Sequence, residues 1–194
     1  MDEELFKPIR HKINRPSLRT LIGKKDLIGA EIGVYLGKNA ENMLVGLDMQ
    51  RLYLIDPYLN EDGKLSGTTT SSSRILELRY NSHYRLERFH SKIVWIEKKS
   101  EYAVNDIKDS ELDFVYIDGD HTYIAVKKDI ELYFPKVKIG GLIAGHDYDP
   151  PDENNGVIQA TQEFFGSKGY DILSGISLDD LRSNDWWCFK KNTG

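Results

Sequence analysis

Short apolar runs alternate with amphipathic segments along most of this sequence, and this alternation constrains the fold more than any other feature. Apolar runs of strand length occupy residues 27–34, 51–56, 92–96, 112–117 and 141–145. Helical spacing of apolar residues predicts helices over residues 38–47, 74–90, 100–107, 123–134 and 157–165. Strictly alternating strands and helices predict an α/β fold, in which helices cover both faces of a parallel sheet.

The C-terminal part breaks this alternation. Two further strands are expected at residues 170–173 and 186–190, with no helix between them. Consecutive strands favour an antiparallel hairpin at one edge. The prediction is therefore a doubly wound, mostly parallel seven-stranded sheet with an antiparallel C-terminal edge hairpin. Trp186 and Trp187 should pack on opposite faces of that sheet, with Cys188 in the core.

Length and composition set the domain organisation. With 194 residues, the chain favours one domain at 27–194, preceded by a basic N-terminal arm at 1–26. A single cysteine excludes an internal disulfide framework and any zinc site built from several cysteines. The N-terminus lacks the apolar core of a signal peptide, and no apolar run approaches the ~20 residues of a membrane span. We therefore expect a cytoplasmic protein without a membrane partner.

Charge is unevenly distributed. The net charge of −5 argues against a nucleic-acid partner. Residues 7–25 nevertheless hold seven Lys or Arg and no acid, whereas residues 144–185 hold nine Asp or Glu. These segments are either two solvated faces, or a basic arm that meets an anionic substrate or the acidic patch of a neighbouring subunit. The sequence leaves open whether the chain forms a homo-oligomer.

Glycine and polar residues follow four of the predicted strands. In a doubly wound sheet, ligands bind outside the carboxyl ends of the strands. The residues at these ends are Gly33, Tyr35 and Gly37 after the first strand, Asp56 after the second, Asp118, Asp120 and His121 after the fourth, and His146 and Asp147 after the fifth. Four strand ends of this kind at one sheet edge predict a single functional site.

The glycine turn and Asp56 suggest a nucleoside-containing cofactor. Gly33 and Gly37 permit close approach of a ligand to the backbone, and Asp56 is placed to accept hydrogen bonds from a ribose diol. This pair alone fits nicotinamide dinucleotides and S-adenosylmethionine. The turn lacks the G-x-G-x-x-G pattern that seats a pyrophosphate. Glu31 could balance the ammonium and sulfonium of S-adenosylmethionine, so the spacing favours that cofactor.

Several motifs make the chain similar to a known family. They are AEIGVYLGKNA, YLIDPY, FVYIDGDHTYIAVKKDI, GGLIAGHDY and GVIQATQEFF followed by WW. From about residue 28 to 189 the chain resembles the class I S-adenosylmethionine-dependent methyltransferases, which have a Rossmann-like fold, and within them the macrocin-type sugar O-methyltransferases. The resemblance implies a cofactor-binding set of Glu31, Gly33, Tyr35, Gly37, Asp56, Ser100 and Asp118. Glu31 and Gly33 would meet the methionine part, Asp56 the ribose and Ser100 the adenine. Residues 97–99 (EKK) depart from the family pattern before that serine.

The resemblance also implies a divalent metal, usually magnesium. Two carboxylates brought together from adjacent strand ends repel each other unless a cation or a proton lies between them. In the resembling enzymes the metal is held by the counterpart of Asp118 and by an acidic pair after the fifth strand. This chain has His146 in place of the first acid of that pair, followed by Asp147. Imidazole is a poor magnesium ligand, because magnesium prefers oxygen. The sequence therefore leaves three alternatives: magnesium held by Asp118 and Asp147 with other oxygens, a softer ion, or no metal.

A candidate general base follows Asp118 closely in the sequence, beside the expected metal site. His121, with a reference pKa near 6.5, suits removal of a hydroxyl proton at neutral pH, and Asp120 is the alternative. The expected function is metal-assisted O-methylation of a small polar acceptor such as a sugar or glycoside. The alternatives are a non-catalytic S-adenosylmethionine- or nucleotide-binding module and, less favoured, an NAD-dependent oxidoreductase. The acceptor should contact residues 57–73 and the N-terminal arm.

Overall fold

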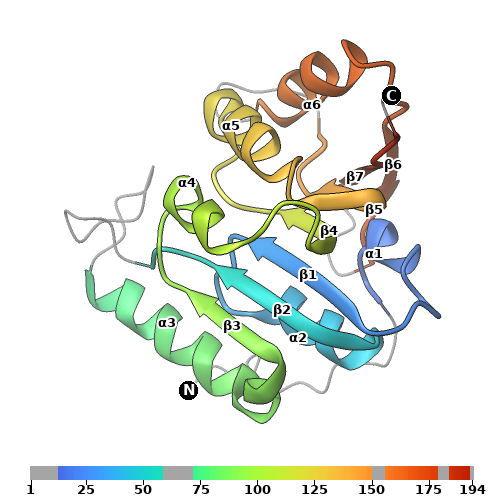
Figure 1. Cartoon of the computed structure of the whole chain (residues 1–194). Helices are drawn as coiled ribbons and strands as arrows, with labels where there is room; N and C mark the ends of the chain where they lie inside the picture. The colour runs from blue at the N-terminus through green and yellow to red at the C-terminus, as the bar shows by residue number, and fades with distance from the viewer. Residues whose placement is uncertain (1–12, 59–71, 150–155, 179–183, 193–194) are drawn as a thin grey trace.

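A seven-stranded sheet in the order β3-β2-β1-β4-β5-β7-β6 forms the centre of the molecule (Figure 1). The computed structural model describes residues 13–58, 72–149, 156–178 and 184–192. The strands are β1 (Leu27–Ile32), β2 (Met49–Ile55), β3 (Ile93–Ile96), β4 (Leu112–Ile117), β5 (Val137–Gly145), β6 (Leu173–Ile176) and β7 (Asn184–Phe189). The first five are parallel, whereas β7 pairs antiparallel with both β5 and β6. The predicted doubly wound sheet with its C-terminal hairpin is confirmed.

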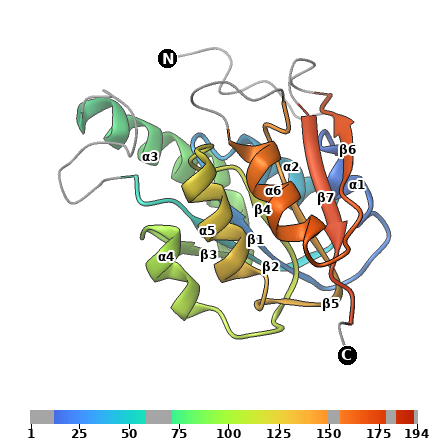
Figure 2. The same ribbon diagram turned by 90° about the horizontal axis from the view of Figure 1, so that it is seen from above.

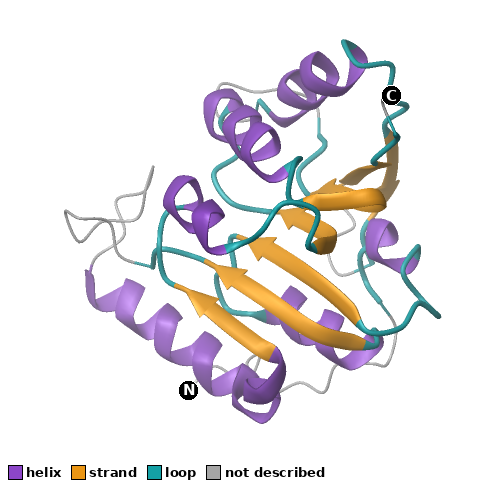
Figure 3. Ribbon diagram, viewed as in Figure 1, coloured by secondary structure: helices purple, strands orange, loops and turns teal. Residues whose placement is uncertain are grey.

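Helices cover both faces of this sheet (Figures 2 and 3). They are α1 (Pro16–Arg19), α2 (Lys38–Gly46), α3 (Ser72–Leu86), α4 (Ser100–Ala103), α5 (Tyr123–Tyr133) and α6 (Val157–Gly166), with 3-10 helices at Glu87–Lys92 and Val104–Asp106. The first three helices share one apolar core and the last three share the other. The result is a three-layer α/β/α arrangement.

Alternation along the strands builds these two cores. In β4, Phe114 and Tyr116 face α1, α2 and α3, whereas Val115 faces α4, α5 and α6. Trp186 packs in the second of these cores, where Cys188 is also buried, and Trp187 packs against the first. The prediction for this tryptophan pair is therefore confirmed, because neighbouring residues of a strand point to opposite faces.

Several element boundaries differ from the predictions; for example, β5 begins at Val137 rather than at residue 141. The strand expected at 170–173 begins only at Leu173, because Tyr170 is buried against Phe165 in a loop. Strand β6 itself is largely exposed, so it carries no apolar signal. The helices expected at 74–90 and 100–107 each end in a 3-10 helix.

The segment before β1 packs on the sheet. Ile13, Leu18 and Leu21 are buried in the core beside α2. Within this segment, the Oγ of Ser17 donates a hydrogen bond to the carboxylate of Asp185 on β7. The same carboxylate accepts a hydrogen bond from the Tyr116 hydroxyl at 2.8 Å. Residues 1–12 of the predicted arm lie outside the described residues. In the described part of the chain, no helix has the length and apolar character required to cross a membrane.

The sheet reverses its strand order between β1 and β4. From β1 the chain proceeds outward to β2 and β3 and then returns to β4 on the other side of β1. The last paired residues are Ile32 and Ile117, so Gly33 and Asp118 lie side by side where the two strands end. Such a switch point is where open α/β sheets bind their ligands.

We predict that Gly33→Ala destabilises the fold. Gly33 has a φ of 85°, and a Cβ there would lie 2.0 Å from the carbonyl oxygen of Asp118. Left-handed strain and a clash with backbone should together lower the free energy of unfolding by about 2–4 kcal/mol. Urea denaturation measures this change. Gly166→Ala is the control, because a Cβ there meets nothing within 4 Å; equal stability of both variants would refute the steric argument.

Candidate active site

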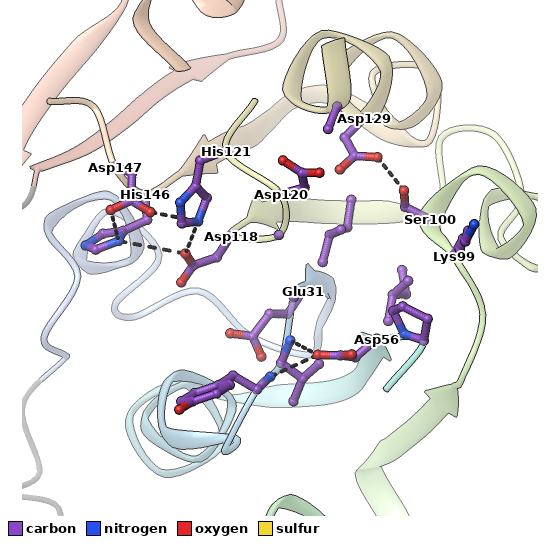
Figure 4. Close-up of a pocket in the computed structure, with 18 of the residues that line it drawn as sticks. Glu31, Asp56, Lys99, Ser100, Asp118, Asp120, His121, Asp129, His146 and Asp147 are labelled. Carbon is purple, nitrogen blue, oxygen red and sulfur yellow. Dashed lines mark hydrogen bonds and ion pairs between the residues drawn. The ribbon is translucent and has the colours of Figure 1, made fainter. Parts of the chain in front are cut away.

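A cavity of about 1140 Å³ opens at the carboxyl ends of the strands (Figure 4). Its lining brings together most of the predicted site residues: Glu31, Gly33, Tyr35, Asp56, Ser100, Asp118, Asp120, His121, His146 and Asp147. Gly37 is not in that lining. It precedes α2 with a φ of 70°, and a Cβ there would meet the side chain of Leu86 at 3.0 Å.

The carboxylate of Asp56 is hydrogen-bonded to the backbone of the glycine turn. Its Oδ2 accepts hydrogen bonds from the backbone N–H groups of Val34 and Tyr35, at 2.9 and 3.0 Å. Its Oδ1 accepts one from the N–H of Tyr58 at 2.9 Å. Burial raises the pKa of Asp56, although these backbone bonds oppose the shift. Because Oδ1 receives one bond in this arrangement, it can accept a further hydrogen bond from a hydroxyl.

Glu31, in β1, is a buried acid inside the cavity. Its Oε1 accepts a hydrogen bond from the amide of Asn39 at 2.8 Å, whereas its Oε2 has no partner among the described residues. Burial raises the pKa of Glu31 to about 8, against the effect of the Asn39 bond. An unpartnered buried carboxyl oxygen is costly unless a ligand satisfies it. Glu31 is therefore suited to a ligand that carries positive charge.

Two aspartates and two histidines gather beside Glu31 (Figure 4). The Nε2 of His121 lies 2.9 Å from Oδ2 of Asp147 and 4.0 Å from Oδ1 of Asp118. The Nδ1 of His146 lies 3.2 Å from Oδ1 of Asp147 and 3.7 Å from Oδ1 of Asp118. Asp147 adopts a left-handed φ of 55°, which is rare outside glycine and is typical of functional sites.

The charges in this cluster compensate one another. The hydrogen bond to Asp147 raises the pKa of His121 against the cost of burial. Burial alone would lower the pKa of His146, but the bond to Asp147 and the charge of Asp118 raise it. Burial alone would raise the pKa of Asp147, yet the two imidazoles hold it far below its usual range. Burial raises the pKa of Asp118.

His121, rather than His146, completes the candidate metal-binding group. Single ligand atoms of Asp118, His121 and Asp147 lie within 4.8 Å of one another. His146 is buried, and its Nε2 has no hydrogen-bond partner among the residues described. His146 lies outside this group of three, although its Nδ1 is near both carboxylates. The sequence assigned it to the metal only through the family resemblance.

The opposite end of the cavity holds Ser100 and Asp129. The Ser100 Oγ donates a hydrogen bond to Oδ1 of Asp129 at 2.5 Å. Asp129 is buried, and burial raises its pKa to about 6. Asp120 is exposed, and its Oδ1 accepts a hydrogen bond from the N–H of Thr122 at 2.9 Å, just before α5. That local bond favours a turn-forming role for Asp120 over that of the base.

Three residues of the site were absent from the sequence-based set: Arg15, Asn39 and Asp129. Arg15 lines the cavity with its Nη2 3.8 Å from Oδ2 of Asp118, and its Nη1 donates to Ser177 at 3.0 Å. The basic run at 7–25 signalled cationic contacts there without choosing a residue. Asp129 had a signal of its own, since it is an acid at the apolar spacing of α5, between Val126 and Ile130.

Comparisons with known proteins agree with this architecture. The profile of a family described as a methyltransferase domain matches residues 30–148. The uncharacterized protein R132 of Acanthamoeba polyphaga mimivirus is 26% identical over 92% of this chain and 75% of its own length.

Two solved structures share the fold. An O-methyltransferase from Bacillus cereus in complex with SAH has a TM-score of 0.62 at 14% identity, covering 90% of this chain and 78% of that one. A precorrin-6y C5,15-methyltransferase from Geobacter metallireducens has a TM-score of 0.63 at 14% identity, covering 90% and 86%. The matched profile spans more than half of the chain, including the glycine turn, Asp56, Asp118 and Asp147. The chain therefore belongs to the methyltransferase-domain family, with the Rossmann-like fold of class I S-adenosylmethionine-dependent methyltransferases.

Proposed function

We propose that this methyltransferase uses S-adenosylmethionine to methylate a hydroxyl of a small polar acceptor, such as a sugar or glycoside. One observation carries the proposal: a buried acid with an unpartnered oxygen and a histidine–aspartate pair line the same cavity. The acid suits a cationic methyl donor, and the pair suits removal of a proton from a nucleophile. The macrocin-type subgroup agrees with these roles and with the motifs of the sequence.

Glu31 supports S-adenosylmethionine over a dinucleotide. Its free Oε2 can accept a hydrogen bond from the ammonium of the methionine part, and its charge attracts the sulfonium. The pyrophosphate of NAD would instead face three acids, Glu31, Asp56 and Asp118, at the same switch point. The negative charges of the pyrophosphate and of these carboxylates repel each other within one cavity, so the cavity disfavours NAD.

His121 is the proposed base. Asp147 accepts a hydrogen bond from Nε2, which leaves Nδ1 of a neutral ring as the nitrogen that can take the acceptor's proton. The oxygen so exposed attacks the methyl carbon in line, the carbon–sulfur bond breaks, and S-adenosylhomocysteine leaves. Holding the oxygen and the methyl carbon in attack geometry can supply about 7–11 kcal/mol at the limit.

The cluster fits a divalent cation. Asp118, Asp147 and His121 would hold it, and the mixed oxygen and nitrogen donor set suits manganese, iron or zinc better than magnesium. A bound ion would supply Lewis acidity that lowers the pKa of the acceptor hydroxyl. The two roles of His121 compete: an ion bound at Nε2, the nitrogen beside both carboxylates, would leave the single hydrogen of the neutral ring on Nδ1, which could then not take the acceptor's proton. His146 would orient both carboxylates through Nδ1.

We predict that cofactor binding depends on the protonation of Glu31. A cationic cofactor favours the carboxylate, whereas the free protein holds this group with a pKa of about 8. The affinity for S-adenosylmethionine should therefore rise with pH and level off above about pH 8, with proton release on binding at pH 7. Calorimetry in buffers of different ionisation enthalpy measures both effects.

Glu31→Gln should abolish this proton release, whereas Glu163→Gln, which removes an acid on α6 paired with Lys127, should retain it. Binding that is independent of pH in the wild type would contradict the role of Glu31.

We predict that His121→Ala lowers kcat by about 10²–10⁴, the usual contribution of a general base. Affinity for S-adenosylmethionine should not change, because His121 faces Asp147 rather than Glu31. Formation of S-adenosylhomocysteine with a panel of hydroxyl-bearing acceptors measures kcat. His90→Ala is the control, since His90 is exposed and, among the described residues, its ring bonds to the carbonyl of Glu87. A wild-type kcat in His121→Ala would exclude it as the base.

We predict that chelation removes activity and leaves cofactor affinity nearly intact, because the cluster faces the acceptor. Titration with Mn²⁺, followed by electron paramagnetic resonance, should show one bound ion in the wild type. Asp118→Asn should lose it, because it removes one of the two carboxylates in the cluster. If His121→Ala also loses the ion, His121 is a ligand; if it keeps the ion but not the activity, His121 is the base. Full activity in chelator would show that the enzyme is metal-independent.

A further inference from the structure

Helix α3 has apolar side chains on two opposite faces. Ile75 and Leu86 are buried in the core beneath the helix. On the opposite face, Leu76, Tyr80 and Tyr84 have exposed fractions of 53%, 67% and 60%. Residues four positions apart are neighbours on one side of a helix, so these three form a continuous outer stripe. A helix with an apolar stripe on each face is suited to packing between two partners.

The outer stripe lies at the periphery of the molecule. Figure 1 shows α3 on the outside, beside the edge strand β3. The rings of Tyr80 and Tyr84 stack on each other, with centroids 6.2 Å apart and planes inclined by 14°. Single exposed apolar side chains are ordinary, but a contiguous patch marks an interaction surface, and tyrosine is enriched in such surfaces. The stripe is therefore a candidate interface.

Charged groups beside the stripe indicate which partner fits it. Among the described residues, Arg79 donates to Glu97 through Nε alone, so its two Nη groups remain available. Glu87 begins the 3-10 helix that follows α3; it is exposed, and its carboxylate forms no ion pair within the described part of the chain. Arg79 and Glu87 are separated by about 12 Å along the helix axis, so they do not pair within one chain.

An antiparallel second copy of α3 would bring these groups together. Across a two-fold axis near position 82, Tyr80 lies beside Tyr84 of the second copy. The same axis places Arg79 beside Glu87 of the second copy. A two-fold axis repeats each contact, so both the tyrosine pair and the charge pair are formed twice. Apolar and charged contacts are therefore satisfied by one arrangement.

We propose that the outer stripe of α3 is a homodimer interface, in which α3 packs antiparallel against α3 of a second copy of this chain. One helix from each copy makes a small interface, so the dimer dissociates on dilution. Leu78 of the same helix lines the cavity, and the interface would therefore also support one wall of the active site.

The free edge of the sheet at β6 is a weaker candidate for this interface. Leu173 and Ile176 are exposed there, at the end of the strand order. No residue of β6 is charged, so this strand has no charge pair that would select a second copy.

Sedimentation equilibrium of the full chain, over a range of protein concentrations, tests the proposal. The wild type should show a reversible equilibrium between monomer and dimer. Tyr80→Ser should weaken the dimer about 30-fold, the effect of losing one interface hot spot. Circular dichroism should show an unchanged fold, because Tyr80 is exposed. A wild type that is monomeric at every concentration, or a Tyr80→Ser variant that dimerises as the wild type does, would overturn the proposal.

Two charge variants test the antiparallel arrangement. Glu87→Arg and Arg79→Glu each place like charges together in a homodimer, so each should weaken it. When the two variants are mixed, every such contact joins opposite charges, and a heterodimer should form more readily than either homodimer. If mixing does not increase the dimer fraction, the two helices do not pair in this way and the proposal is wrong.

Leu173→Ser is the matched control, because it removes an exposed apolar side chain at the other candidate surface. This variant should dimerise as the wild type does. Loss of the dimer in Leu173→Ser, with the dimer kept in Tyr80→Ser, would locate the interface at the edge of the sheet and refute the assignment to α3.

Discussion

Negative charge crowded at one sheet edge is the constraint on which the rest of the site depends. Parallel strands end at the same edge, so Glu31, Asp56, Asp118 and Asp147 come together regardless of their distance in the sequence. Each acid is stabilised differently. Backbone N–H groups stabilise Asp56, two imidazoles stabilise Asp147, Arg15 lies near Asp118, and Glu31 retains a proton near neutral pH because burial raises its pKa to about 8. A positively charged donor is the ligand that such an edge favours.

These different environments divide the cavity by function. Glu31 and the glycine turn form its centre, the histidine–aspartate cluster forms one end, and Asp129 with Ser100 forms the other (Figure 4). In the proposed function, the methyl group lies at the end that holds the His121–Asp147 pair.

The N-terminal segment also belongs to this charge balance. Arg15 contacts Asp118 and Asp185, and Asp185 in turn bonds Ser17 and Tyr116 beneath the sheet edge. The residues before β1 therefore close one side of the cavity as well as covering one core. Their basic run is explained in part by this contact, because a buried arginine offsets two acids, Asp118 after β4 and Asp185 in β7.

The sequence by itself determined the fold class and most of the site, because both depend on local patterns. Alternating apolar residues defined the central strands, and glycine and acids at their ends marked Gly33, Asp56 and Asp118. Tertiary structure decided the rest. Strand β6 is an exposed edge with no apolar pattern, Arg15 reaches the cavity only because α1 packs on the sheet, and Asp129 becomes a site residue because α5 lies beside Ser100. His121, and not His146, joins Asp118 and Asp147 in the candidate metal-binding group. This choice depends on side-chain distances across two loops, and these distances arise only when the strands are assembled.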